Sequence, residues 1–378
     1  MKKSGRRLLE FRKLLGSLKV ALDIPHVELA LKHAWKRLRY DQPGIATTIV
    51  DGKKVYETAG EAELQEWLDS TFIATLYYLP SSSELALRVH HYVIEGIGTI
   101  LFWQCLLQNI ASSECDTDVR FGDEHARLPT SLEEILGYTA PATPYQVQQA
   151  TGILMHYAAN LPSIGLASKV GNAPAANCQH MEYCLSRETT AAITRACKTH
   201  QLSVTSAVHA ACINTNIKHA DPASNTARYT TANEYNLRPY LPAPYNTPDR
   251  ALSVYYATMP FSIGLPASFS NIATKLNEEY WSRLRDHPDV VQLAGHYTRI
   301  LADMAAATPG FQNGPIARDP IREYGSTMRV EDFILGLDVV LGMSALLIYT
   351  FRGIAFGVRT YMEDINRVLS EELLGLSG

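Results

Sequence analysis

Several features that would assign a chain to a class at once are missing from these 378 residues. The six cysteines form no Cys-x-x-Cys pair, so neither a disulfide framework nor a zinc site is indicated, and a reducing, cytoplasmic location fits. A glycine-rich phosphate-binding loop is also missing. The formal net charge of −4 gives no electrostatic reason to expect a nucleic-acid partner. We therefore expect no metal and no nucleic acid.

Long uninterrupted apolar runs are missing as well. The most apolar window, residues 333–356, contains Asp338 and Arg352 and is broken by glycines, so it predicts buried strands and not a membrane span. Residues 1–19 are basic, but charges interrupt their leucines and no apolar signal-peptide core follows. We interpret this start as a solvated amphipathic segment and expect no membrane partner.

The composition that remains is that of an ordinary soluble enzyme, with 46% hydrophobic and 19% charged residues. This length allows two lobes with their own cores. A stretch rich in Gly, Ala, Pro and Asn indicates a linker at 166–180, between an N-terminal lobe at 1–165 and a C-terminal lobe at 181–378. Both lobes mix helical and strand periodicity, which predicts an α/β fold.

The expected elements of the two lobes follow from periodicity and turn signals. In the first lobe they are a helix from about 25 to 40, a hairpin at 47–58, a helix at 59–69, a strand at 84–91 with a helix after Gly96, and helices at 132–136 and 144–160. In the second lobe they are a strand at 181–185, helices at 187–200 and 203–219, a loop at 236–249, a strand at 252–258, helices within 269–307 and strands within 328–359.

The most informative stretch is His90 to Gly98, which reads His-His-Tyr-Val-Ile-Glu-Gly-Ile-Gly. Alternation before it places His91 on the apolar face of the expected strand, immediately before a helix start. A lone histidine on such a face is more often a satisfied core residue than a catalyst. The tandem histidines, the acid four residues later and the glycine after it favour the catalytic interpretation.

This string resembles the His-His-x-x-x-Asp-Gly signature of the chloramphenicol-acetyltransferase-like acyltransferases, a superfamily that includes alcohol acyltransferases and condensation domains. Asn236-Leu-Arg-Pro-Tyr240, the segment at 252–258 and Tyr349-Thr-Phe-Arg-Gly353 look like fungal acetyltransferases that act on trichothecene hydroxyls. Matching landmarks run from about residue 20 to 376. Two features depart from the family: position 95 is Glu where Asp is usual, and fewer residues precede the first core helix.

The resemblance implies two lobes with an active site in a tunnel between them. It implies a CoA-dependent O-acyltransferase, most simply an acetyltransferase, that acts on a hydroxyl of a fungal secondary metabolite such as a terpenoid. Acetyl-CoA or another acyl-CoA would be a co-substrate, with no tightly bound cofactor. The partners would be the acyl-CoA and a small alcohol, and we expect a monomer.

Residue roles are carried over by position. His91 would be the general base, and Glu95 would be mainly structural through a pair with Arg238 of the other lobe. The candidate oxyanion or substrate contacts are Ser253 and Tyr255. The remaining site-shaping candidates are His90, Gly96 and Asn236. Gly96 and Gly98 could admit a ligand or simply allow tight packing of helix on strand.

Two alternatives stay open at this point. The same fold could promote cyclisation or dehydration, with His91 or Glu95 as acid and base, because Glu replaces the usual Asp. The chain could also be a degenerate, non-catalytic homologue that binds without turnover. The sequence leaves open the acceptor, the acyl length, the oligomeric state and the basic side chains that would hold the CoA pyrophosphate.

Overall fold

The computed structural model describes most of the chain in segments. These are residues 14–22, 24–50, 53–58, 74–112, 119–137, 142–165, 183–222, 224–282, 291, 293, 295–296, 300, 328–337, 349–351, 354–357, 364–365 and 367–375. The helix expected at 59–69 and the linker expected at 166–180 lie outside these residues.

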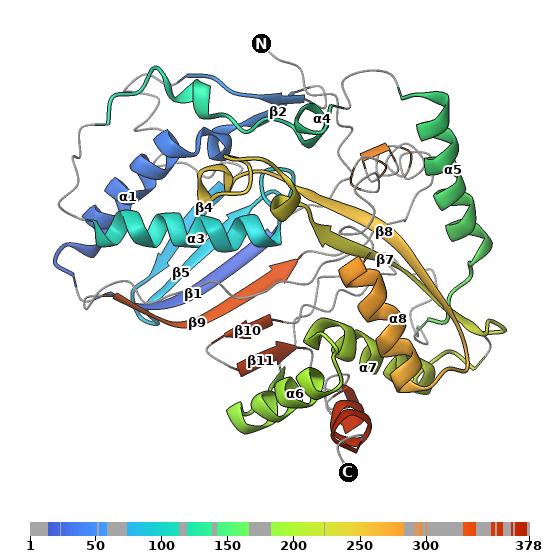
Figure 1. The fold of residues 1–378 in the computed structure, drawn as a ribbon. Helices are drawn as coiled ribbons and strands as arrows, with labels where there is room; N and C mark the ends of the chain where they lie inside the picture. Colours follow the sequence, from blue (N-terminus) through green and yellow to red (C-terminus); the bar gives the residue numbers. More distant parts are fainter. Residues whose placement is uncertain are drawn as a thin grey trace.

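A four-stranded antiparallel sheet forms the first core (Figure 1). Its strands are β1 (Leu14–Leu22), β4 (Ala74–Leu79), β5 (Glu84–Val89) and β9 (Met328–Leu337), in the order β4-β5-β1-β9. Because β9 comes from the second half of the chain, this sheet combines strands from both expected lobes, and the lobe limits stay a prediction. The pairing of β1 with both β5 and β9 places it inside the sheet.

This position of β1 overturns the expectation of a solvated start for residues 14–19. Leu18 and Val20 are fully buried, whereas Lys19 between them is exposed. That pattern is the period of two of a strand with one covered face. Lys19 therefore marks the exposed face of the sheet, and Leu18 and Val20 mark its buried face.

Two helices cover this sheet (Figure 1). They are α1 (Val27–Asp41) and α3 (Gly96–Ala111), and their apolar stripes meet where the rings of Trp35 and Phe102 pack edge to face at 6.0 Å. Both side chains belong to one core cluster with Leu18, Leu85 and Leu87 of the sheet. Beside them lie η1 (Pro43–Ala46) and the expected hairpin, β2 (Thr48–Val50) with β3 (Lys53–Val55).

The second half is organised around a long antiparallel pair, β7 (Arg228–Asn236) and β8 (Tyr256–Gly264). The expected helices appear as α4 (Leu132–Ile135), α5 (Pro144–Ala159), α6 (Arg187–Thr199), α7 (Val204–Lys218) and α8 (Phe269–Ser282). A small sheet has the order β10-β11-β6, from β10 (Tyr349–Phe351), β11 (Ile354–Gly357) and β6 (Tyr183–Cys184), and one helical turn spans Leu369–Leu374.

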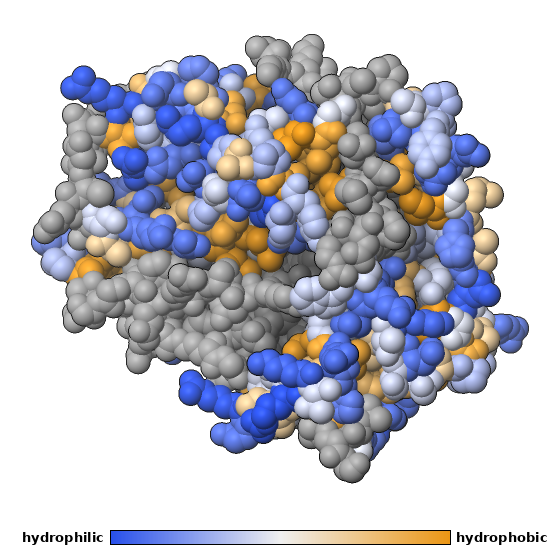
Figure 2. Space-filling model, viewed as in Figure 1, coloured by the Kyte–Doolittle hydropathy of each residue, from blue (hydrophilic) through white to orange (hydrophobic). Residues whose placement is uncertain are grey.

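Side-chain caps explain why three of these helices begin where the sequence predicts. Thr143 accepts a hydrogen bond from the backbone N–H of Gln146, and Ser186 and Ser203 accept equivalent bonds in α6 and α7. Such caps satisfy N–H groups that have no partner within the helix. Figure 2 shows hydrophilic side chains over the outer surfaces of α1 and α6, which fits helices with one buried face.

Two expected strands have different limits, and both differences concern the site. The strand expected at 84–91 ends at Val89, and the strand expected at 252–258 begins only at Tyr256. The residues before Tyr256 instead supply backbone groups to other parts of the chain: the carbonyl of Tyr255 accepts a bond from the N–H of Leu237. Among the described residues, no helix has the length and apolar character to cross a membrane.

Candidate active site

His91 lies in the turn between β5 and α3, not on the strand. The N–H of Val93 donates to the carbonyl of His90 at 2.9 Å, which closes this turn. The imidazole is almost fully buried, and its ring meets the ring of Tyr256 edge to face at 6.1 Å. Burial lowers the pKa of His91, while a hydrogen bond with its own backbone acts in the opposite direction. The ring is therefore neutral at neutral pH.

Glu95 links the turn to the start of α3. Its Oε2 atom accepts a hydrogen bond of 2.6 Å from the N–H of Gly98, so Glu95 is the N-cap of the helix. Its Oε1 atom accepts a bond of 2.8 Å from Nε of Arg238, 143 positions later in the chain. Both side chains are buried. The contact implied by the family resemblance is thus present, and the longer Glu side chain reaches both partners.

Arg238 begins η3 (Arg238–Tyr240), directly after β7, and its guanidinium has further acceptors. Nη1 donates to the carbonyl of Arg250 at 2.9 Å, and Nη2 donates to the carbonyl of Ala251 at 3.2 Å and to Oγ of Ser253 at 3.0 Å. A buried charge is tolerated when it is paired and hydrogen-bonded in this way. Arg238 therefore joins the N-terminus of α3 to the loop that leads into β8.

The other second-half candidates surround this arginine. Asn236 accepts a bond of 3.1 Å from the N–H of Arg238. The Ser253 hydroxyl donates to the carbonyl of Arg250 and accepts from Arg238, and the Tyr255 hydroxyl donates to the carbonyl of Thr130 at 2.9 Å. Burial raises the pKa of Tyr255 to about 12. Both hydroxyl protons are therefore engaged by backbone carbonyls.

Tyr256, and not Tyr255, is the aromatic residue that meets His91. From the sequence, Tyr255 was the tyrosine given the candidate site role. Consecutive residues of an extended chain point to opposite sides, so only one of the two can face the turn. Alternation could have separated them, but it does not say which side His91 occupies.

The motif's other members have distinct surroundings. The His90 ring stacks on Tyr92 at 5.2 Å. A Cβ atom at Gly98 would lie 2.5 Å from the carbonyl oxygen of Ala251, so this glycine is required for close packing of α3 on the loop. A Cβ atom at Gly96 would have nothing within 4 Å. Packing therefore explains Gly98, whereas Gly96 has space beside it.

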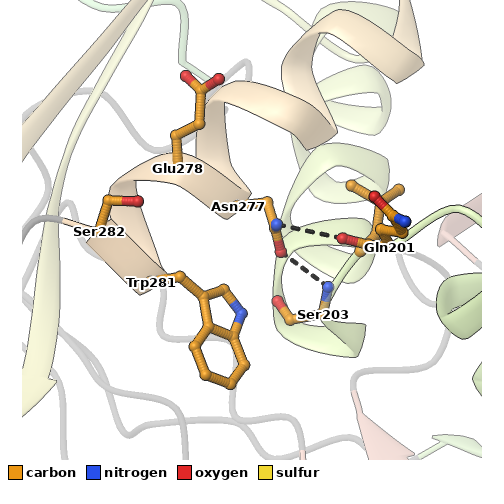
Figure 3. A pocket seen from close by; sticks show the side chains of 7 residues that line it. Gln201, Ser203, Asn277, Glu278, Trp281 and Ser282 are labelled. Carbon is orange, nitrogen blue, oxygen red and sulfur yellow. Dashed lines mark hydrogen bonds between the residues drawn. The ribbon is translucent and has the colours of Figure 1, made fainter. Parts of the chain in front are cut away.

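A separate hollow lies at the end of α8 (Figure 3). It has a volume of about 390 Å³ and is lined by Gln201, Leu202, Ser203, Asn277, Glu278, Trp281 and Ser282. Asn277 accepts a bond from the N–H of Ser203 at 2.8 Å and donates to the carbonyl of Gln201 at 3.3 Å, so its amide holds the loop before α7. None of these residues belongs to the His91 site. The tunnel expected between the lobes stays a prediction.

The fold is shared with known acyltransferases. The structure of the TRI3 trichothecene 15-O-acetyltransferase from Fusarium sporotrichioides matches with a TM-score of 0.74 at 13% sequence identity, over 96% of this chain and 90% of that one. The predicted α/β fold with two chloramphenicol-acetyltransferase-like lobes is thereby confirmed. No protein-family model matches the chain.

Two curated fungal proteins are similar in sequence. The O-acetyltransferase pigM of Monascus ruber is 25% identical over 390 residues, which span 91% of this chain and 76% of pigM. The acetyltransferase pigO of the same organism is 29% identical over 265 residues, 64% of this chain and 57% of pigO. The shared fold and these sequence similarities agree with the resemblance to the chloramphenicol-acetyltransferase-like acyltransferases.

Proposed function

We propose that the protein is a CoA-dependent O-acyltransferase that transfers an acyl group, most simply acetyl, to a hydroxyl of a fungal secondary metabolite. The observation that carries this proposal is the buried His91 in a turn fixed by the Glu95–Arg238 pair, with Tyr256 against its ring. The names of pigM and the trichothecene acetyltransferase support acetyl as the transferred group and a secondary metabolite as the acceptor.

In the proposed reaction, His91 acts as a general base toward the acceptor. An alcohol is a poor nucleophile at neutral pH because its proton must leave as the new bond forms. The neutral imidazole takes that proton while the alcohol oxygen attacks the thioester carbonyl carbon. The C–S bond then breaks, and the imidazolium returns the proton to the departing thiolate. Such proton transfer contributes about 10²- to 10⁴-fold in rate.

We assign the neighbouring groups to positioning. The carboxylate of Glu95 has one oxygen on the N–H of Gly98 and the other on Arg238, so its role is to hold the turn and the loop together. Ser253 and Tyr255 were candidates for oxyanion stabilisation, but their protons are directed at the carbonyls of Arg250 and Thr130. They instead fix the loop that carries Tyr256.

The geometry weakens the cyclisation alternative. That alternative uses His91 or Glu95 as the acid and base, and it was kept open by the Glu at a position where the family usually has Asp. Both oxygens of the Glu95 carboxylate are occupied, one by the N–H of Gly98 and the other by Nε of Arg238. Glu95 is thus engaged within the protein, so acyl transfer through His91 is the better account.

The test compares two histidines in one assay. The purified protein is incubated with acetyl-CoA and a panel of terpenoid and aromatic alcohols, and released thiol and acetylated product are measured. We expect His91→Gln to lose at least about 100-fold in kcat/KM. The matched control is His209→Gln, at a half-buried histidine of α7, which should keep the parent rate.

Circular dichroism and a melting curve confirm that both variants are folded at the assay temperature. Equal turnover by His91→Gln and the parent would exclude His91 as the base. An absence of thiol release from the parent with every alcohol, together with no binding of acetyl-CoA, would favour the non-catalytic alternative.

A further inference from the structure

One face of the β7–β8 pair extends from His91 into the second half of the molecule. In the antiparallel register Asn236 lies opposite Tyr256, Glu234 opposite Thr258, Ala232 opposite Pro260 and Thr230 opposite Ser262. Residues two apart on a strand share a face, as do directly opposed residues. Because the ring of Tyr256 meets His91, this face is the one that borders the reacting site.

The first pair beyond Tyr256 is polar and charged. Thr258 donates a hydrogen bond of 2.8 Å from Oγ1 to Oε1 of Glu234. Thr258 is buried and Glu234 is half-buried, so the carboxylate lies within the protein and its position is set by the threonine. One strand repeat of two residues, roughly 7 Å, separates this pair from Tyr256.

The next pair along the same face is apolar. Ala232 and Pro260 are both buried, and beyond them Ser262 donates at 3.1 Å to Oγ1 of Thr230, which in turn donates at 2.7 Å to the carbonyl of Asn160. The face therefore presents an aromatic ring beside His91, then a carboxylate with its threonine, then an apolar surface. An acceptor complementary to this face has two polar groups and is otherwise apolar.

We propose that Glu234 determines acceptor specificity by binding a second hydroxyl of the acceptor, on the strand face that begins beside His91 and one strand repeat beyond Tyr256. This inference rests on the proposed acyl transfer and names its substrate class: a neutral, mostly apolar diol or polyol. The ionised carboxylate accepts a charge-assisted hydrogen bond from an alcohol. A carboxylate at Glu234 disfavours an acceptor that carries a carboxylate of its own, because two like charges close together repel.

The chemistry also predicts how the site discriminates. A site built to bond a hydroxyl rejects the analogue that lacks it much more strongly than an apolar pocket rejects an extra methylene, because its own polar group is then left unpaired. Truncation of Glu234 should therefore abolish a preference between two acceptors and leave the chemical step intact. This behaviour separates a specificity role from a role in catalysis.

The experiment uses two matched probes, 2,6-dihydroxynaphthalene and 2-naphthol, with acetyl-CoA and the full chain. We expect the parent to favour the diol by at least tenfold in kcat/KM. Glu234→Met should lose this preference, because kcat/KM falls with the diol and rises with 2-naphthol, which no longer leaves a carboxylate unpaired. Glu234→Gln, which keeps a carbonyl acceptor, should restore part of it, and Thr258→Val should reduce it by a smaller factor.

Ser262→Ala is the control, because it lies on the same face but beyond the apolar pair, and it should leave the preference unchanged. An unchanged preference in Glu234→Met, or equal losses with both probes, would overturn the inference. Calorimetric binding of the two probes repeats the comparison without turnover. If the diol binds more tightly through Glu234 and no thiol is ever released, the proposed reaction fails while the binding site stands.

Discussion

Two histidines sit in polar clusters in the two halves of the chain, one buried (His91) and one half-buried (His209), and their surroundings differ in kind. His91 lies in a turn against the ring of Tyr256, and the nearby support of that turn is ionic, through Glu95 and Arg238. His209 lies on α7, where its Nδ1 is 2.9 Å from the Tyr280 hydroxyl and its Nε2 is 3.1 Å from the Tyr229 hydroxyl.

The hydrogen bonds of His209 assign it a structural role. A neutral imidazole has one N–H donor and one acceptor nitrogen. At His209 both nitrogens are engaged by tyrosines from α8 and β7, so this ring holds three elements together and has no nitrogen left for a substrate. Burial lowers the pKa of both histidines, so the direction of the pKa shift does not distinguish them. The two tyrosine partners of His209 are what assign that residue to structure.

The largest effect on this comparison should come from Glu95→Ala. The substitution removes the cap of α3 and leaves the Arg238 guanidinium buried without its carboxylate, which costs about 3–5 kcal/mol in similar cases. We expect the free energy of unfolding, measured by urea denaturation, to fall by that amount, with loss of activity. A double variant, Glu95→Met with Arg238→Met, should regain part of the stability because no buried charge remains. If Glu95→Ala melts like the parent and loses only activity, the structural role is wrong.

A smaller effect is expected at His209, where the cluster is neutral. His209→Leu deprives the Tyr229 and Tyr280 hydroxyls of their partner, and each unsatisfied buried group costs about 1–3 kcal/mol. Stability should therefore fall measurably while kcat/KM of the remaining folded protein stays at the parent value. Tyr280→Phe is the matched control, because it removes one of the two bonds and should cost less. Loss of turnover in folded His209→Leu would mean that this cluster also serves the reaction.

The sequence predicts part of this arrangement, and the misses have identifiable causes. Helices α5, α6 and α7 were predictable because their N-terminal Thr143, Ser186 and Ser203 caps are local signals. Strand β1 was missed because its alternation becomes meaningful only when β5 and β9 lie on either side of it. Tertiary pairing of this kind overrides local pattern.

In the site, too, some features could be predicted from the sequence and others depend on tertiary contacts. The contact of Glu95 with Arg238 spans 143 positions and was expected only through the family resemblance, since no local spacing connects the two residues. The bonds of Arg238 to the carbonyls of Arg250 and Ala251 explain why the chain before Tyr256 is a loop and not a strand. Side-chain patterns do not report on backbone carbonyls, so this part of the site needs the structure.

The smallest predicted effect is a difference in pH dependence between the two histidines. Burial lowers the pKa of His209 to about 4, below the usual 6.5, so the unfolded chain binds a proton there more readily than the folded one does between those values. Stability must then decrease as the pH falls from 6.5 toward 4, by at most about 1.4 kcal/mol per pH unit for each such group. His209→Gln should flatten this slope in urea denaturation curves and leave the pH profile of kcat/KM unchanged. In the proposed mechanism the pH profile of kcat/KM reports the protonation of His91. Because the pKa of His91 is also lowered, the acid limb of kcat/KM should have its midpoint below pH 6.5. An acid limb with its midpoint above pH 6.5 would mean that the base is a different group, and the distinction between the two histidines would then lose its kinetic half.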